Sequence, residues 1–325
     1  MKKIFVGLFF SIGGLYLAFG QIDFKNLSLV FSSVRWLPII FASLAMVLSV
    51  WIRALRWRLI LCPIKHLDTN SLFEATMIGY FGNSILPLRL GEFMRAYALK
   101  RNSLSISAAF GTIVIERTLD MIGIMILIIL LFFSYDIPFW LLKSGLVVSI
   151  FVVIISLFLF WITLKHDQFI KKLIGFQFFR SGIRKKILDM IQSLMIGLTT
   201  LRKVKQIKVI VFNSLLLWGI YWLITFLCIY AVGIKLSFIQ VGILMVAVTM
   251  IIILPAAPGF IGTYHAGAVL VLVEVFGVSQ TSAQAYALIN HAVGFIPLIV
   301  IGAFYFFRSS MTLEDIKSIK ISSSS

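Results

Sequence analysis

The chain has little charge, and negative charge is especially scarce. Only 13% of its 325 residues are charged, with 12 Asp or Glu against 29 Lys or Arg. Apolar residues make up 61% of the chain, and the mean hydropathy is +1.06. Because a soluble domain carries about 25% charged residues, these proportions exclude one. They indicate a single all-α, polytopic membrane domain.

Cysteine and histidine are also scarce. The two cysteines, Cys62 and Cys228, lie in different apolar segments, so we expect no disulfide framework. Four scattered histidines argue against a metal centre. The motifs HExxH, GxSxG, the P-loop and paired CxxC are missing from the sequence. We therefore expect no cofactor and no soluble type of enzyme chemistry.

The positive charge lies beside apolar runs. Lys165–Lys208 holds eleven Lys or Arg, and Arg53, Arg56 and Arg58 end another apolar run beside Trp51 and Trp57. Such clusters are typical of the cytoplasmic ends of membrane helices, where they also attract anionic lipid. This placement argues against nucleic acid as a partner and favours a cell-membrane protein with both termini in the cytoplasm.

Several apolar runs reach the roughly 20 residues that cross a bilayer. We expect about seven or eight crossings in a domain over 1–308, followed by a short cytoplasmic tail over 309–325. Residues 4–20 are interpreted as an uncleaved first span rather than a signal peptide. The segment 165–207 has apolar residues at helical spacing, which predicts an amphipathic cytoplasmic helix on the bilayer. No repeat is visible at the residue level, so any internal repeat would be structural.

Two stretches interrupt the apolar pattern with proline, glycine and polar residues. They are GNSILPLRLGEFMR within 71–99 and LPAAPGFIGTYHAG within 254–276. Non-helical backbone at membrane depth needs protein or a wet cavity around it. A pair of such interruptions, one in each half of the chain, is typical of transporter binding sites. Basic residues on both flanks of the first predict a re-entrant hairpin.

The first interruption holds Asn83, Arg89, Glu92 and Arg95. In a helix that starts after Pro87, Glu92 shares a face with both arginines. Glu92 could then hold two guanidinium groups towards a phosphate or carboxylate. The alternative is that the arginines only cap a hairpin near the lipid headgroups.

The span at about 105–133 holds Glu116, Arg117 and Asp120. The two carboxylates lie one turn apart and need a cation or a shared proton at membrane depth. Available partners include Arg89 and Arg95. Three interpretations stay open: an ion-pair network that fixes the helix to the first interruption, a proton- or ion-coupling site, and a headgroup site.

The second interruption holds Pro255, Pro258, Gly259, Gly262, Tyr264 and His265. Its prolines free carbonyl groups, and its glycines permit positive φ or close backbone approach. A helix that restarts near Gly262 would direct its N-terminal amides towards an anion. Tyr264 and His265 are candidate polar groups at the break, although histidines in apolar surroundings are more often packed than reactive. His291 is a weaker candidate for the same reason.

Three motifs together carry a resemblance. N-x3-P-x-R-x-G-E-x2-R, E-R-x2-D and P-x2-P-G-x2-G begin at Asn83, Glu116 and Pro255 and occur in that order. The combination resembles the lysylphosphatidylglycerol synthase transmembrane region family of flippase-like domains, over nearly the whole chain. The resemblance implies a bacterial or archaeal inner-membrane protein with re-entrant segments.

In multidomain relatives this region flips aminoacylated phosphatidylglycerol, and other relatives are linked to polyprenyl-phosphate sugar transfer. The 325 residues leave no room for the soluble aminoacyl-transferase domain, and His265 stands where the family often carries Glu. We expect a lipid translocase for an anionic, aminoacylated or polyprenyl-phosphate lipid, with a separate lipid-modifying enzyme as a second partner. The alternatives are an intramembrane transferase for a polyprenyl-phosphate sugar and a non-catalytic membrane scaffold.

Overall fold

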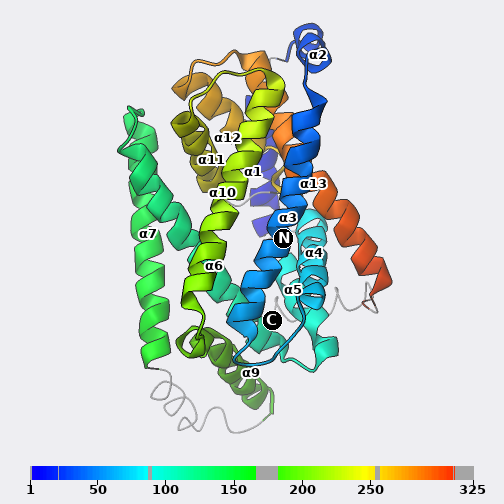
Figure 1. Cartoon of the computed structure of the whole chain (residues 1–325), viewed down its shortest axis with the longest axis vertical. Coiled ribbons are helices and arrows are strands. Elements are labelled where there is room, and N and C mark those ends of the chain that lie inside the picture. Colours follow the sequence, from blue (N-terminus) through cyan, green and yellow to red (C-terminus); the bar gives the residue numbers. More distant parts are fainter. Residues whose placement is uncertain are drawn as a thin grey trace.

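The computed structural model describes residues 2–20, 22–86, 90–165, 182–252, 257–309 and 311, and these contain helices and no strand. The all-helical fold class is therefore confirmed for the described residues (Figure 1). The elements are α1 (Lys2–Phe19), α2 (Phe24–Ser32), α3 (Trp36–Leu61), α4 (Thr69–Ile85), α5 (Gly91–Ala98), η2 (Leu99–Asn102), α6 (Ile106–Phe132), α7 (Phe139–Leu164), α9 (Gly182–Thr199), η4 (Thr200–Lys203), α10 (Ile207–Val232), α11 (Phe238–Ile252), η5 (Pro258–Phe260), α12 (Thr263–Leu270), η6 (Val271–Val275) and α13 (Gln280–Arg308).

Five described helical segments are long and apolar enough to cross a membrane: α3, α7, α10, α13 and the run Pro258–Val275. The 27-residue α6 is also long enough to cross a membrane, but it carries Glu116, Arg117 and Asp120. Helix α6 matches the span expected at about 105–133 within one residue at each end. The chain is thus a polytopic membrane protein, and the exact number of crossings stays a prediction.

Helices α3 and α10 lie side by side and antiparallel at the centre of the bundle (Figure 1). The Arg35 amide, at the start of α3, donates to the Ala231 carbonyl near the end of α10 at 3.0 Å. Near the other end of the pair, Arg56 donates to Ser214 at 3.0 Å. Contacts at both ends fix the two helices in opposite directions.

One order of elements occurs twice in the chain. Helices α3 and α10, each of 26 residues, are followed by shorter helices α4 and α11 of 17 and 15 residues. After a break come α5 and α12, each of 8 residues, a short distorted turn, and the long helices α6 and α13 of 27 and 29 residues. Because α3 and α10 are antiparallel, the two halves form an inverted repeat, an architecture that many transporters share.

The first interruption folds as a helical hairpin of α4 and α5. The Lys65 ammonium, before α4, donates to the Asn102 carbonyl in η2 after α5, so the chain enters and leaves the hairpin at the same end. Inside the hairpin a Cβ on Gly91 would lie 2.0 Å from the Gly79 carbonyl oxygen. The glycines thus let the two backbones touch. Re-entry from the cytoplasmic side remains a prediction.

Helix α1 packs on the second interruption. A Cβ on Gly262, where φ is +92°, would lie 1.9 Å from the Ser11 carbonyl oxygen. A Cβ on Gly14 would lie 2.7 Å from the Gly262 carbonyl group. The Ser11 hydroxyl also accepts a hydrogen bond from the Ala257 amide at 2.8 Å. Helix α1 is therefore a packed part of the bundle.

Helix α9 covers part of the predicted amphipathic segment, and residues 166–181 of that segment lie outside the described residues. Met195 and Leu198 of α9 are buried in one cluster with Ile115 of α6. A Cβ on Gly111 of α6 would lie 2.9 Å from the Gly197 Cα. The apolar face that we expected to lie on the bilayer is thus packed on α6.

Candidate functional site

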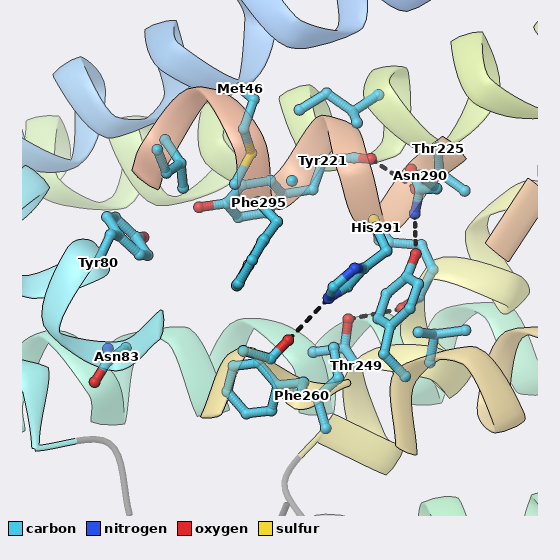
Figure 2. A pocket seen from close by; sticks show the side chains of 18 of the residues that line it. Met46, Tyr80, Asn83, Tyr221, Thr225, Thr249, Phe260, Asn290, His291 and Phe295 are labelled. Carbon is cyan, nitrogen blue, oxygen red and sulfur yellow. Dashed lines mark hydrogen bonds between the residues drawn. The ribbon is translucent and has the colours of Figure 1, made fainter. Parts of the chain in front are cut away.

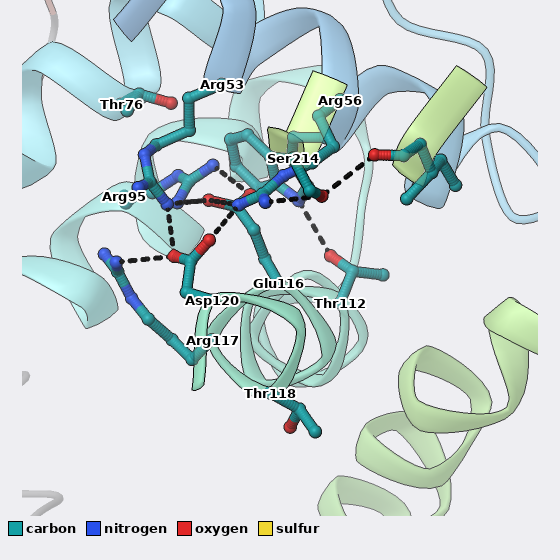
Figure 3. Close-up of polar contacts among 12 residues, drawn as sticks. Arg53, Arg56, Thr76, Arg95, Thr112, Glu116, Arg117, Thr118, Asp120 and Ser214 are labelled. Atoms are coloured by element: carbon teal, nitrogen blue, oxygen red, sulfur yellow. Dashed lines mark hydrogen bonds and ion pairs between the residues drawn. The ribbon is translucent and has the colours of Figure 1, made fainter. Parts of the chain in front are cut away.

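Seven charged side chains from α3, α5 and α6 form one ion network. Figure 3 labels Arg53, Arg56, Arg95, Glu116, Arg117 and Asp120, and Glu92 is the remaining member. Glu116 lies at its centre and is fully buried. Arg53 donates to Glu116 Oε1 at 2.7 Å, and Arg95 donates to Oε2 at 2.8 Å and to Oε1 at 3.2 Å. Both oxygens of Glu116 are therefore held by charge-assisted hydrogen bonds, the strong kind.

Asp120, one turn further along α6, is bound by two arginines of α3, one of which is also bound to Glu116. Arg56 lies 2.6 Å from Oδ1, and Arg53 lies 2.8 Å from Oδ2. The expectation that Glu116 and Asp120 face the same way is confirmed, because Arg53 reaches both. The network interpretation also agrees with this geometry, since it joins α6 to α5 and to α3.

Neutral groups of α10, α3 and α6 complete the network. The second nitrogen of Arg53 donates to the Tyr221 hydroxyl at 3.0 Å. The guanidinium carbon of Arg95 lies 3.8 Å from the ring centroid of Trp57, a cation–π contact. Trp57 itself donates to the Thr112 hydroxyl at 2.9 Å. The buried arginines thus have hydrogen-bonding and aromatic partners besides the carboxylates.

Arg117, Glu92 and Asp120 form the partly exposed edge of this network, with side chains that are 33%, 16% and 20% exposed. Arg117 and Glu92 are paired with each other. Arg117 also lies 3.4 Å from Asp120, whereas Arg95, 1% exposed, lies 3.9 Å from Glu92. Of the seven charged side chains, only Glu92 and Arg117 line a cavity.

That cavity has a volume of about 360 Å³ and lies between the two halves of the inverted repeat (Figure 2). Each element of both halves contributes to its wall, apart from the short turns η2 and η6. The lining residues are Met46, Tyr80, Asn83, Ser84, Glu92, Arg117, Tyr221, Ile224, Thr225, Met245, Val248, Thr249, Ile252, Gly259, Phe260, Tyr264, Tyr286, Asn290, His291, Gly294, Phe295 and Leu298.

Asn83 joins the two parts of the first interruption at this wall. Its Oδ1 accepts a hydrogen bond from the Gly91 amide at 2.9 Å, across the bend between α4 and α5. Gly91 is the first residue of α5, whose N-terminal amides have no partner within the helix. Asn83 therefore stabilises the start of α5 from the end of α4.

Polar groups of α12 and α13 lie at the other end of the cavity. The Asn290 amide donates to the Tyr264 hydroxyl (Figure 2). His291 Nε2 lies 2.8 Å from the Gly259 carbonyl oxygen, so this nitrogen carries the proton. Gly259 has φ +70°, and a Cβ there would lie 2.5 Å from the Phe295 ring. The second interruption thus presents its backbone to α13.

The structure separates the predicted site residues into four groups. Asn83, Glu92, Arg117, Gly259 and Tyr264 line the cavity. Arg95, Glu116 and Asp120 lie behind its wall in the ion network. Pro258, Gly262 and His265 are not among the lining residues. Arg89, with 87–88, and Pro255, with 253–256, lie outside the described residues.

Gly262 and Thr263, where the anion-binding helix start was expected, are not among the residues that line the cavity. Gly262 is packed against the α1 backbone, and its amide lies 3.4 Å from His265 Nδ1. His265 is 4% exposed and packs against Phe19, with 5.5 Å between ring centroids. His291, the weaker candidate, is the histidine that reaches the cavity.

The interpretation of Arg53, Arg56 and Trp57 as an interfacial belt is wrong. Arg53 is 4% exposed, and Arg56 and Trp57 are fully buried. Arg58 is exposed and bonds to Thr69 at 3.1 Å, as a belt residue would. The helical period contains the missed signal: Arg53 and Arg56 are three apart and share a face, which Arg58 does not.

No cluster of His, Cys, Asp and Glu that could hold a metal ion occurs among the described residues. The chemical capacity of the site lies in its charge. Four guanidinium groups face three carboxylates, so the seven side chains together carry a net charge of +1. Arg117 is the member that brings this charge to the cavity wall.

Comparison with known proteins places these residues in a family context. A family model described as the lysylphosphatidylglycerol synthase TM region matches residues 4–302. A UPF0104 membrane protein of Methanothermobacter thermautotrophicus is 24% identical over 84% of this chain and 87% of its own length. One from Methanocaldococcus jannaschii is 22% identical over 70% of this chain and 93% of its own length. One from Pyrococcus horikoshii is 25% identical over 81% of this chain and 85% of its own length.

Proposed function

Because the chain belongs to the lysylphosphatidylglycerol synthase transmembrane region family, we propose that it moves the headgroup of an anionic lipid across the membrane through its central cavity. The family is associated with lipid handling, and the chain is an integral membrane protein. We place it in the cell membrane with both termini in the cytoplasm, as the basic clusters suggest. A separate lipid-modifying enzyme that supplies the lipid is part of this proposal.

The observation that carries the proposal is that both interruptions line one cavity. Asn83 and Glu92 come from the first interruption, and Gly259 and Tyr264 come from the second. Substrate sites at the interface of inverted repeats, beside discontinuous helices, are typical of secondary transporters. In such proteins one half rocks against the other around the site. The same cavity can then open first to one leaflet and then to the other.

In this proposal Arg117 binds the lipid phosphate. Its guanidinium group is partly exposed and lines the cavity. Glu92 and Asp120 hold the guanidinium group from two sides and orient it. Arg95, which we expected to bind the phosphate directly, is instead assigned to holding Glu116, because it is 1% exposed and bonded to both Glu116 oxygens.

The transferase alternative has weaker support from the geometry. It needs a carboxyl group that exchanges protons with a substrate. Glu116 is fully buried between arginines, and Asp120 accepts from Arg53 and Arg56. Glu92 reaches the cavity but is paired with Arg117. In the described part of the chain each of these carboxylates is thus already engaged by guanidinium groups.

The test is lipid movement in liposomes that contain the purified protein. Phosphatidylglycerol with a fluorescent acyl chain is added to both leaflets, and the fraction that becomes accessible to an external quencher is followed with time. We expect Arg117→Gln to slow the movement at least tenfold, because it removes the cavity cation. Arg58→Gln is the matched control, since Arg58 is exposed and does not line the cavity.

Two results would contradict the proposal. If neither anionic phospholipids nor polyprenyl phosphates move faster than in empty liposomes, the chain does not transport them. The non-catalytic scaffold would then be the better interpretation. Equal rates of lipid movement for Arg117→Gln and the wild type would show that the lipid headgroup does not pass through the cavity. Fluorescence-detected size exclusion of each variant checks that a slow rate does not reflect misfolded protein.

A further inference from the structure

The central cavity has two chemically different ends (Figure 2). One end holds Tyr80 and Asn83 of α4, and Arg117 is the cation among the lining residues of the same half, so this end offers hydrogen-bond donors and positive charge. The other end holds Asn290 and His291 of α13. A ligand that fills the cavity therefore meets a charged end and a neutral polar end.

The neutral end offers hydrogen-bond acceptors. Asn290 donates through its nitrogen to Tyr264, while its Oδ1 is buried and has no partner in the described structure. His291 Nε2 donates to the Gly259 carbonyl, so in the neutral ring Nδ1 carries a lone pair. His291 Nδ1 is therefore a second acceptor at this end. A buried acceptor without a donor, such as Asn290 Oδ1, is costly, so a bound ligand is expected to supply the donor there.

The charge of the lining residues decides which of the two common donors, a hydroxyl or an ammonium group, the neutral end can bind. Glu92 is the one carboxylate among the lining residues, and Arg117 neutralises it. An ammonium group beside Asn290 and His291 would thus have no counter-ion in surroundings of low dielectric constant, which is unfavourable. Hydroxyl groups donate without that penalty. The ion network, with its net charge of +1, favours a ligand of net charge −1.

We propose that the cavity selects a phosphodiester lipid whose headgroup carries neutral hydroxyl groups, such as glycerol or a sugar, with the phosphate at Arg117 and the hydroxyls at Asn290 and His291. This inference rests on the proposed transport function and narrows its substrate class. Asn290 and His291 are then the specificity-determining residues. An aminoacylated headgroup brings an extra ammonium group and fits this end less well.

The experiment uses the same liposomes with four lipids. Phosphatidylglycerol and phosphatidylpropanol have the same charge and similar headgroup size, but phosphatidylpropanol lacks the hydroxyl groups. Lysyl-phosphatidylglycerol adds a lysyl ester with two amino groups, and a polyprenyl-phosphate hexose exchanges glycerol for a sugar and the acyl chains for a prenyl chain. We expect phosphatidylglycerol, the polyprenyl-phosphate hexose or both to move about tenfold faster than phosphatidylpropanol and the lysyl lipid, because the acceptors find donors.

Variants then locate the selectivity. Asn290→Leu keeps a similar volume and removes the acceptor, so we expect the rate for the hydroxylated lipid to fall to that for phosphatidylpropanol. The readout is the ratio of the two rates, and fluorescence-detected size exclusion checks that the variant is folded. His291→Phe should act in the same direction. Ser144→Ala, at an exposed position of α7, is the control that should keep the full preference.

Several outcomes would overturn the inference and leave transport intact. If the wild type moves phosphatidylglycerol, the polyprenyl-phosphate hexose and phosphatidylpropanol at equal rates, the cavity does not recognise hydroxyl groups. Faster movement of the lysyl lipid would show that the neutral end takes an ammonium group. If both Asn290→Leu and His291→Phe keep the preference for the hydroxylated lipid over phosphatidylpropanol, other residues determine the selectivity. If none of the four lipids moves, the proposed function fails as well.

Discussion

Arg53 donates one hydrogen bond of 2.7 Å to Glu116 and thereby joins α3 to α6 at full burial. The same nitrogen reaches Asp120 at 2.8 Å, and the other terminal nitrogen reaches Tyr221 of α10. One guanidinium group thus ties together α3, α6 and α10. The two halves of the inverted repeat are connected through this group, directly behind the cavity wall.

Glu116→Gln should destabilise the protein strongly. The change removes one negative charge from a carboxylate held by buried arginines, and it leaves them without enough counter-charge. Breaking a buried pair by removing one partner costs about 3–5 kcal/mol. The measurement is the midpoint of thermal unfolding in detergent. Glu274→Gln, at an exposed position of η6, is the control and should leave the midpoint unchanged. A midpoint for Glu116→Gln within a degree of the wild type would contradict the network.

Gly91→Ala should loosen the hairpin of α4 and α5. The added Cβ would lie 2.0 Å from the Gly79 carbonyl oxygen and 2.6 Å from Asn83 Oδ1, so the two helices must separate. We expect a loss of about 3 kcal/mol, at the upper end of overpacking changes, together with slower lipid movement, because Asn83 and Glu92 would shift. Gly219→Ala in α10 is the control, since a Cβ there meets nothing within 4 Å. Equal stability of the two variants would contradict this close packing.

Gly111→Ala should release α9 from α6. A Cβ at Gly111 would lie 2.4 Å from the Leu194 carbonyl oxygen of α9. Limited proteolysis of the purified protein should then cut within α9 several-fold faster than in the wild type, because the clash of about 1–3 kcal/mol favours the undocked helix. Gly13→Ala in α1, where a Cβ meets nothing within 4 Å, is the control. If both variants resist protease like the wild type, α9 does not depend on this contact.

Asp68 should make the start of α4 sensitive to acid. The Ser71 amide and hydroxyl donate to its carboxylate at 2.9 and 2.8 Å, and these hydrogen bonds lower the pKa of Asp68. A lowered folded-state pKa means that the stabilisation is present above the unfolded pKa and is lost as the pH falls through the folded value. The protection factor of the Ser71 amide, which corrects the exchange rate for its intrinsic pH dependence, should therefore fall in that acidic window. Asp68→Ala should show fast exchange at neutral pH, at a cost of about 1 kcal/mol, while Asp68→Asn keeps the cap. Protection of Ser71 that is independent of pH would contradict this cap.

The positions of the helices follow closely from the sequence, and the partners of the charges do not. Length and apolarity locate α3, α7, α10 and α13, because a helix that crosses lipid needs about 20 apolar residues. The same sequence does not state that Arg53 and Arg56 point inward while Arg58 points outward. That depends on which face of α3 meets α6 and α10, and helix packing alone decides it.

By itself the sequence determined a polytopic helical membrane protein with an interruption in each half and charged residues beside the first. These are local properties, set by the cost of placing charges, prolines and free backbone groups in lipid. Only the tertiary structure decided that both interruptions line one cavity, that α3 and α10 are antiparallel, and that His291 rather than His265 reaches the cavity. Those relations join residues more than a hundred positions apart, and the packing of the inverted halves brings them together.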